Sequence, residues 1–122
     1  MYLGYYEKFK GAPTILLAGS KTSIVNLMSI FSAARNNNID LLDMLSKQEE
    51  IRVLSILSFH IINNYYDKLS YSDGCVTWHV SSSLRDQIIG MLSGLIETSD
   101  PGHQYLNSDK IQIICSKDEY DF

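Results

Sequence analysis

The chain reads KLSYSDGCVTWHV from Lys68 to Val80, and this segment is the clearest structural signal in the sequence. The Asp73-Gly74 dipeptide at its centre favours the two-residue type I′ turn of a β-hairpin. Such a hairpin separates an apolar face from a polar face, because alternate side chains of a strand point to opposite sides of the sheet. The predicted pairs are Ser72–Cys75 at the turn, Tyr71–Val76 and Leu69–Trp78 on the apolar face, and Ser70–Thr77 and Lys68–His79 on the polar face.

Two helical patterns flank this hairpin. On its C-terminal side, apolar residues recur at helical spacing from Leu84 to Leu95, and Ser83 with Asp86 approximates a capping box. On the N-terminal side, the apolar stripe that follows Ser20 consists of Ile24, Leu27, Met28 and Phe31. Each of the two patterns predicts an amphipathic helix with one buried face.

Short apolar runs near both ends of the chain predict further strands. Residues 2–9 and 14–18 are separated by the turn residues 10–13, an arrangement typical of a first hairpin. Residues 111–115 form a last apolar run of strand length.

The segment 39–62 is ambiguous, because residues 41–45 fit a helical turn whereas residues 51–62 favour strands. Hairpins favour an antiparallel sheet, and two amphipathic helices can each lay one stripe on the same face of it. We therefore predict a single α+β domain over residues 1–122. Its architecture is a two-layer sandwich, in which an antiparallel β-sheet has two amphipathic helices packed on one face.

The composition narrows the class of protein. The 122 residues are 45% hydrophobic and 20% charged with a formal net charge of −4, values that match a folded domain rather than a disordered chain. The acidic balance argues against a general nucleic-acid binder, which needs a basic surface to displace counterions from phosphates. Residues 97–122 hold six acidic residues against Lys110 and Lys117. This acidic end is either a solvated surface or a surface that attracts a basic partner.

No metal, cofactor or membrane segment is indicated by the sequence. Cys75 and Cys115 lie forty residues apart without the spacing of zinc ligands, so we interpret both as reduced thiols of the core. The first ten residues lack the basic head and apolar run of a signal peptide, and the apolar stretches are shorter than the roughly 20 residues of a membrane span. We expect a cytoplasmic protein that binds no cofactor.

His103 is the histidine best placed for chemistry. Asp100-Pro101-Gly102 ends the preceding helix and leaves His103 and Tyr105 in a loop before the last strand. With Asp118 or Glu119, His103 would form an acid–base pair, as in a small hydrolase or nuclease. Alternatively, His103 and Tyr105 tie the loop to the sheet. The sequence contains no GxGxxG, Walker, HExxH or GxSxG signature.

The segment Lys117-Asp118-Glu119-Tyr120-Asp121-Phe122 combines three acidic side chains with two aromatic ones. This is the composition of a charged, frayed chain end. It is also that of an interface anchor, in which aromatic rings bury area on a partner at low entropic cost and acidic groups pair with Lys or Arg. Both interpretations stay open on the residues alone.

Three short motifs give about the last fifty residues a resemblance to a known group. In chain order, the first motif is Val76-Thr77-Trp78, which leads into a predicted helix. The second is Gly102-His103-Gln104-Tyr105-Leu106, and the third, after a predicted strand, is Ser116-Lys117-Asp118-Glu119-Tyr120. The pattern resembles small bacterial proteins, among them immunity proteins of contact-dependent growth inhibition and related polymorphic toxin systems. The resemblance implies a cytosolic protector that binds the toxin domain of a sibling cell and blocks its active site, or holds it inactive, without doing chemistry itself.

The resemblance and the acidic end together predict a stoichiometric inhibitor of a bacterial toxin, a nuclease with a basic surface, that contacts no nucleic acid and no membrane. The alternatives are a small hydrolase or nuclease that uses His103 with a C-terminal carboxylate, and a homo-oligomer built through the aromatic-rich first hairpin. The predicted toxin-binding residues are Asp118, Glu119, Tyr120, Asp121, His103 and Tyr105. If these are not the contact surface, the acids to consider are Asp40, Asp43, Glu49 and Glu50.

Overall fold

Residues 1–33 and 37–122, which the computed structural model of the protein describes, form nine strands in two sheets and three helices. The five-stranded sheet has the spatial order β4 (Arg52–Leu54), β1 (Tyr2–Phe9), β2 (Ala12–Gly19), β9 (Gln112–Lys117) and β8 (Gly102–Tyr105). The four-stranded sheet has the order β3 (Ile39–Asp40), β5 (Ser58–Asn63), β7 (Cys75–Val80) and β6 (Lys68–Ser72). Because β1–β4, β2–β9 and β5–β7 pair in parallel, the prediction of an antiparallel sheet is wrong, whereas the α+β class is confirmed.

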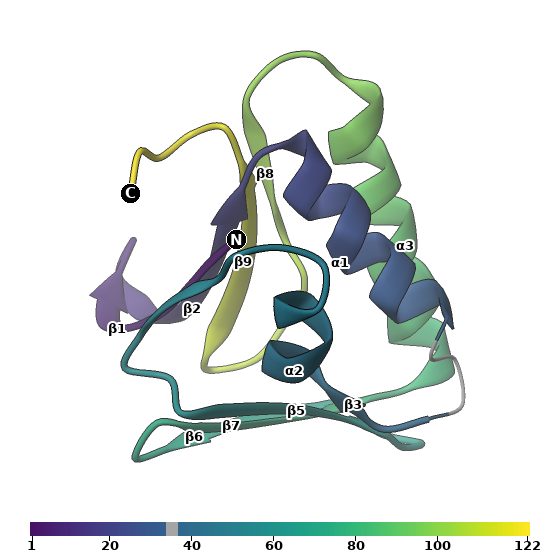
Figure 1. Cartoon of the computed structure of the whole chain (residues 1–122). Coiled ribbons are helices and arrows are strands. Elements are labelled where there is room, and N and C mark those ends of the chain that lie inside the picture. The colour runs from purple at the N-terminus through teal and green to yellow at the C-terminus, as the bar shows by residue number, and fades with distance from the viewer. Residues whose placement is uncertain (34–36) are drawn as a thin grey trace.

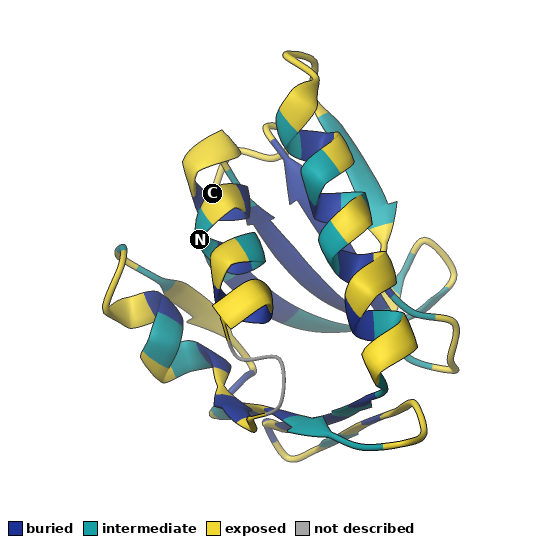
Figure 2. Ribbon diagram, turned by 90° about the vertical axis from the view of Figure 1, so that its right-hand side faces the viewer, coloured by how far each residue is buried: buried dark blue, intermediate teal, exposed yellow. Residues whose placement is uncertain are grey.

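Helices α1 (Lys21–Ala33) and α3 (Ser82–Glu97) run side by side across one face of the five-stranded sheet (Figure 1, Figure 2). A third helix, α2 (Leu41–Ser46), occupies the ambiguous segment and packs against β5 and α1. Asp40 caps α2 by accepting a hydrogen bond from the Asp43 N–H at 3.1 Å. The four-stranded sheet lies across the end of the helical layer (Figure 1). Within the described ranges, no helix is long and apolar enough to cross a membrane.

The hydrophobic core fills the space between the helices and the inner faces of the two sheets. Figure 2 shows the buried side of α1 and α3 turned towards the strands behind them. Phe31 of α1 meets Trp78 of β7 edge to face, with ring centroids 6.1 Å apart, so the helical layer contacts the second sheet as well. Fully buried contributors include Leu3, Ile15, Leu17, Ile24, Leu27, Phe59, Ile61, Ile88, Leu92 and Ile113.

The hairpin of β6 and β7 confirms the predicted register. The turn residues Asp73 and Gly74 have φ angles of 48° and 85°, the left-handed values that a type I′ turn requires. The apolar face lies in the core, because Val76 and Trp78 are buried there. The observed pairs are Ser72–Cys75, Tyr71–Val76, Ser70–Thr77, Leu69–Trp78 and Lys68–His79.

Three local predictions are wrong. Residues 102–105 form strand β8, not the loop that was expected around His103 and Tyr105. The Ser81 hydroxyl, not that of Ser83, caps α3 by accepting a hydrogen bond from the Leu84 N–H at 3.2 Å, and the helix begins at Ser82. Cys75 is exposed, because its neighbour Val76 takes the core side of β7. Cys115 is buried as predicted, and burial raises the pKa of its thiol to about 12.

Lys117 is buried at the end of β9, although the sequence groups it with the charged C-terminal residues. Its Nζ atom donates to the carbonyl oxygen of Leu95 at 2.6 Å and to that of Thr98. Both carbonyls lie at the C-terminal end of α3, where main-chain oxygens lack partners within the helix. The lysine therefore satisfies the end of α3 and ties it to the end of β9.

Candidate functional site

The face of the five-stranded sheet opposite α1 and α3 is covered by aromatic side chains. Tyr2 and Tyr6 point to this face because they alternate along β1 with Leu3 and Tyr5, which point to the core. We call this surface the aromatic face and define it by Tyr2, Tyr6, Phe9, Tyr120 and Phe122. Buried beneath it are Leu16, Ala18 and Ile114.

Residues 118–122, here called the tail, fold back over this face after β9. Asp118 adopts a left-handed conformation with φ of 58°, which turns the chain, and its N–H donates to the Gly19 carbonyl at 2.9 Å. The Tyr120 ring then meets the Phe9 ring edge to face, with centroids 6.1 Å apart. These contacts fix the start and the middle of the tail on β2 and β1.

The far part of the tail is held by β1 and β4. Phe122 stacks on Tyr2, and the Arg52 guanidinium donates to the main-chain oxygen of Phe122 at 3.0 Å. The Tyr2 hydroxyl in turn lies 2.6 Å from the Tyr6 hydroxyl. Burial, this hydrogen bond and the neighbouring Tyr6 raise the pKa of Tyr2 to about 12, so the tyrosine under Phe122 stays neutral at physiological pH.

His103 and Glu119 form the pair that the sequence left undecided between Asp118 and Glu119. In the β8–β9 register His103 lies opposite Ser116, and its Nδ1 atom is 3.0 Å from both carboxylate oxygens of Glu119. The Ser116 hydroxyl donates to Glu119 Oε1 at 2.7 Å. Burial raises the pKa of Glu119, but the hydrogen bonds from Ser116 and His103, with the nearby charges of His103 and Lys10, outweigh burial and lower it.

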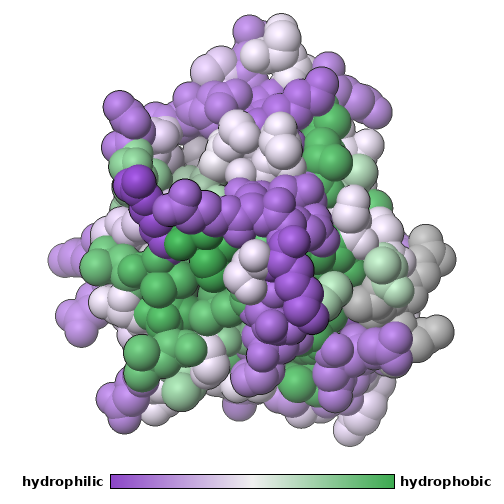
Figure 3. Space-filling model, viewed as in Figure 1, coloured by the Kyte–Doolittle hydropathy of each residue, from purple (hydrophilic) through white to green (hydrophobic). Residues whose placement is uncertain are grey.

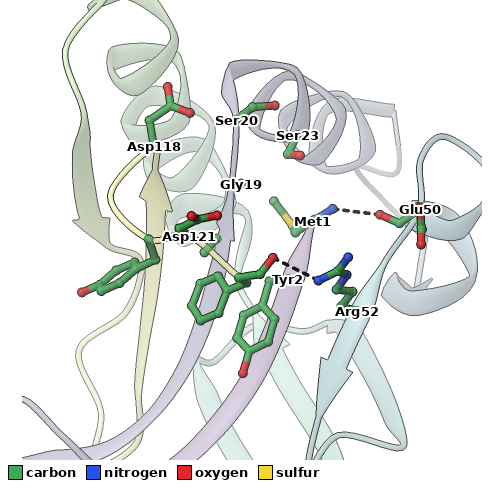
Figure 4. Close-up of a pocket in the computed structure, with 12 residues that line it drawn as sticks. Met1, Tyr2, Gly19, Ser20, Ser23, Glu50, Arg52, Asp118 and Asp121 are labelled. Carbon is green, nitrogen blue, oxygen red and sulfur yellow. Dashed lines mark hydrogen bonds between the residues drawn. The ribbon is translucent and has the colours of Figure 1, made fainter.

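A cavity of about 370 Å³ lies between the tail, the start of α1 and the start of β1 (Figure 4). Asp118 and Asp121 of the tail line it together with Glu50, so three carboxylates surround it. The guanidinium of Arg52 also lines the cavity, and so does Ser20, the residue just before α1. Because a helix N-terminus carries partial positive charge, the acidic side chains of the tail are electrostatically favoured beside α1.

Glu49 holds the starts of β1 and α1 together next to this cavity. Its carboxylate accepts hydrogen bonds from Ser23 at 2.7 Å and from Asn26 at 2.6 Å, and it pairs with the Met1 amino group. The same amino group donates to the Glu50 carbonyl at 3.0 Å (Figure 4). Burial raises the pKa of Glu49, but the Met1 amino group, Asn26 and Ser23 outweigh burial and lower it.

The structure brings the six predicted site residues together in two adjoining groups. His103 and Glu119 form the first group with Tyr105, whose ring meets the His103 ring edge to face at 5.8 Å. The second group lines the cavity and consists of Asp118, Tyr120 and Asp121.

Three of the other acids considered from the sequence have structural partners instead. Asp40 caps α2, Asp43 pairs with Lys47 at 3.1 Å, and Glu49 binds the starts of β1 and α1.

Sequence reasoning missed four residues that hold the tail. Tyr2 and Phe9 support its rings, Arg52 binds its main chain, and Ser116 orients Glu119. The only local signal was the same-face spacing of Tyr2 and Tyr6 in the first strand. No local pattern pointed to Arg52, because its contact with Phe122 joins residues far apart in the chain.

The chemistry available to His103 is set by these contacts. Its Nδ1 atom is engaged by Glu119, an arrangement that orients an imidazole for acid–base work. In nucleophilic catalysis, however, the base contacts a hydroxyl or thiol directly. Here the Ser116 hydroxyl donates its hydrogen bond to the carboxylate of Glu119. Among the described residues, Ser116 therefore orients the tail and is not positioned as a nucleophile by the imidazole.

Among residues 1–33 and 37–122, no group of three or more His, Cys, Asp or Glu side chains is arranged to hold a metal ion. Comparison of the chain with protein-family models, with curated proteins and with solved structures finds no match in any of the three. The resemblance to immunity proteins therefore stays a prediction from the sequence motifs.

Proposed function

We propose that the chain is a bacterial immunity protein that binds a cognate toxin domain, a nuclease with a basic surface, and neutralises it as a one-to-one inhibitor in the cytoplasm. The observation that carries the proposal is the ordered tail on the aromatic face. Tyr120 and Phe122 are 39% and 47% exposed although the ring of each packs on a ring beneath it. Such rings are available to a partner and already fixed in position.

Preorganisation is the energetic argument for the tail as a binding surface. Ordering a free chain end on binding costs conformational entropy, and a segment already docked on its own sheet avoids much of that cost. Aromatic side chains are enriched in the residues that dominate binding energies at protein interfaces. The tail therefore offers a partner two anchored rings, and Tyr105, 43% exposed on the neighbouring strand, adds a third.

Charge supports a basic partner for the same surface. Asp118 and Asp121 are exposed acidic side chains, and hydrogen bonds and nearby charges lower the pKa of Glu119 between them. An acidic surface accelerates encounter with a basic protein, and this effect falls as salt is added. A nuclease domain that binds phosphates carries the complementary basic surface.

The test is binding to the product of the gene directly upstream, followed by stopped-flow kinetics and a nuclease assay. We expect a one-to-one complex in which nuclease activity is lost. The double variant D118N/D121N removes two tail charges and keeps side-chain size, and it should lower the association rate about tenfold at low salt and flatten its salt dependence. The matched control D86N/E97Q removes two exposed charges from α3.

The outcomes distinguish a wrong function from a wrong binding surface. If no complex forms at micromolar concentration, the immunity function is wrong. If the complex forms but D118N/D121N and D86N/E97Q slow association equally, the partner senses net charge, and the tail is not its contact surface.

A small hydrolase or nuclease is the second candidate, and the contact between His103 and Glu119 favours it. That function requires turnover by the purified chain and its loss in His103→Gln. The inhibitor proposal expects no turnover from the chain alone and a His103→Gln variant that still binds the toxin. A nuclease and esterase assay on both proteins decides between them.

A further inference from the structure

Strand β8 forms one edge of the five-stranded sheet, and its main chain is open on the side away from β9. The Leu106 N–H donates to the Ile113 carbonyl at 2.8 Å, which shows where the hydrogen-bonded pairs of this antiparallel ladder fall. Because such pairs alternate with non-hydrogen-bonded ones, Gln104 bonds to β9, whereas His103 and Tyr105 turn their N–H and C=O groups outwards. In the part of the chain that the structure describes, no residue forms a hydrogen bond with these outward groups.

The other three sheet edges are shorter or partly occupied. β3 has two residues, and β4 has three and is followed by Ser55 in a left-handed conformation with φ of 59°. Figure 3 shows hydrophobic residues gathered over the segment that runs from β4 towards β5, and residues 53–58 carry no charge for a basic partner. On β6, the Asp109 carboxylate already accepts from the Leu69 N–H at 3.0 Å. β8 contains neither lysine nor proline, two residues that commonly protect an edge strand, so it is the edge best able to accept a further strand.

The open edge of β8 is continuous with the tail. His103 and Tyr105 pair in register with Ser116 and Ile114, and Ile114 is buried beneath the aromatic face, so their side chains point to that face. The His103 Nδ1 atom also lies 3.0 Å from the Glu119 carboxylate of the tail. A partner that binds the tail therefore reaches the outward main chain of β8 on the same surface.

The opposite side of β8 faces α3. A Cβ atom at Gly102 would lie 3.6 Å from a methyl carbon of Leu95, and Leu84 lines a small cavity together with Asn107, which follows β8 in the chain. Met91 shares this side of the helix, because it follows Leu84 by seven residues and precedes Leu95 by four. Met91 is only half-buried, so a strand added beside β8 would find apolar surface on this side.

We propose that the cognate toxin adds an extended segment alongside β8, as a further strand of the five-stranded sheet, an inference that rests on the immunity function proposed above. The segment exchanges main-chain hydrogen bonds with His103 and Tyr105, and such bonds supply affinity in strand addition whatever the side chains are. Specificity then comes from the side chains, which alternate between the two faces of the sheet.

The two faces define the chemistry of the toxin segment. Side chains on the tail side lie beside the Glu119 carboxylate and the exposed Tyr105 ring, an environment that favours Lys or Arg. Side chains on the α3 side lie towards Met91, where apolar residues are favoured. The expected segment therefore alternates basic and apolar residues.

The experiment is amide hydrogen exchange, followed by NMR, on the whole chain alone and bound to the product of the gene directly upstream. The amides of His103 and Tyr105 should exchange at least about tenfold more slowly in the complex. Tyr71 is the internal control, because its N–H, like that of Leu69, turns away from β7 at the edge of the other sheet. Its exchange should not change.

A substitution tests the main-chain bond itself. Tyr105→Pro removes an outward N–H while the pairing with β9 is kept, since proline is tolerated on an edge strand where the N–H faces solvent. Tyr105→Ala removes the same ring but keeps the N–H, so it is the matched control. By calorimetric titration with the toxin, Tyr105→Pro should bind about tenfold more weakly than Tyr105→Ala.

The outcomes distinguish this inference from the function on which it rests. If no complex forms, the immunity function is wrong, and strand addition with it. A complex that inhibits the nuclease but leaves exchange at His103 and Tyr105 unchanged, or slows it equally at Tyr71, would overturn strand addition alone. So would equal binding by Tyr105→Pro and Tyr105→Ala, or slowed exchange that needs only a higher concentration of the chain itself, which would mean that β8 pairs with a second copy.

Discussion

Phe122 lies flat on Tyr2, with ring centroids 3.8 Å apart and ring planes 6° from parallel. This contact joins residues from opposite ends of the sequence and places the tail over the first strand. Since Arg52 binds the Phe122 main chain from β4, two strands of the sheet hold the same residue. The tail is thus part of the outer layer of the sheet, and its order depends on contacts that single substitutions can remove.

Phe122→Ala should release the far part of the tail while leaving the fold intact. An aromatic pair contributes about 0.5–1.5 kcal/mol beyond its buried area, which is enough to order a short exposed segment. We expect backbone order parameters at Tyr120 and Asp121 to fall below about 0.6 by NMR relaxation. Tyr65→Ala, which removes a 90% exposed ring elsewhere, is the control. An unchanged tail in Phe122→Ala would show that the contacts of Arg52 and of Tyr120 with Phe9 are enough to hold it.

Gly4→Ala should disturb the tail from beneath. A Cβ atom at Gly4 would lie 2.8 Å from the Tyr2 hydroxyl oxygen and 2.9 Å from a Tyr2 ring carbon, so the ring that supports Phe122 has to move. We expect a loss of about 1–3 kcal/mol in the free energy of unfolding by urea denaturation.

The control for this variant has the opposite sign. A Cβ atom at Gly90 of α3 meets nothing within 4 Å, and alanine favours a helix over glycine by about 0.5–1 kcal/mol. Gly90→Ala should therefore stabilise the chain. If both variants stabilise, the Tyr2 ring is not confined over Gly4.

Lys117→Met should destabilise the fold. Methionine fills a similar volume but leaves the Leu95 and Thr98 carbonyls without the ammonium that satisfies them. We expect a loss of about 1–3 kcal/mol by urea denaturation, the cost of a buried acceptor left unpaired. Lys110→Met, at an exposed position, should change stability by less than about 0.5 kcal/mol. Equal stability of both variants would mean that removing a buried charge offsets the lost hydrogen bonds.

Glu49 should contribute to acid sensitivity. Because its pKa is below the usual value of 4.5 in the folded chain, its stabilising contribution is present above that value and is lost as pH falls through the folded pKa. At neutral pH, Glu49→Gln should lower the free energy of unfolding by about 1–3 kcal/mol. As the pH is lowered, the free energy of unfolding of this variant should decrease less steeply than that of the unmodified chain. The measurement is urea denaturation between about pH 3 and about pH 7. The control is Glu97→Gln, on the exposed side of α3, which should change the free energy of unfolding at neutral pH by less than about 0.5 kcal/mol.

The sequence predicted the parts of the fold that local chemistry determines. The register of the β6–β7 hairpin follows from Asp73-Gly74 alone, and the stripes of α1 and α3 follow from spacing along each helix. The parallel pairs β1–β4, β2–β9 and β5–β7 join distant segments, so no neighbouring residues specify them. Those pairs are what turn one predicted antiparallel sheet into two mixed sheets.

The candidate site divides in the same way. The motif residues His103 and Glu119 were identified from the sequence, and the β8–β9 register brings them together. The supports Tyr2 and Arg52 were missed, because their contacts with Phe122 form only when three separate strands are assembled. Composition suggested an aromatic and acidic surface, but it did not show that the surface is docked on its own sheet.

The buried Lys117 has a consequence for how such a protein can change over evolutionary time. The ammonium is anchored on α3, so the direction in which the chain leaves β9 is fixed inside the protein. Residues 118–122 start from that exit direction, and the left-handed Asp118 then turns the chain back over the sheet. If the tail binds a partner as proposed, new specificities would arise by exchange of a few exposed side chains, while the scaffold that presents them stays constant.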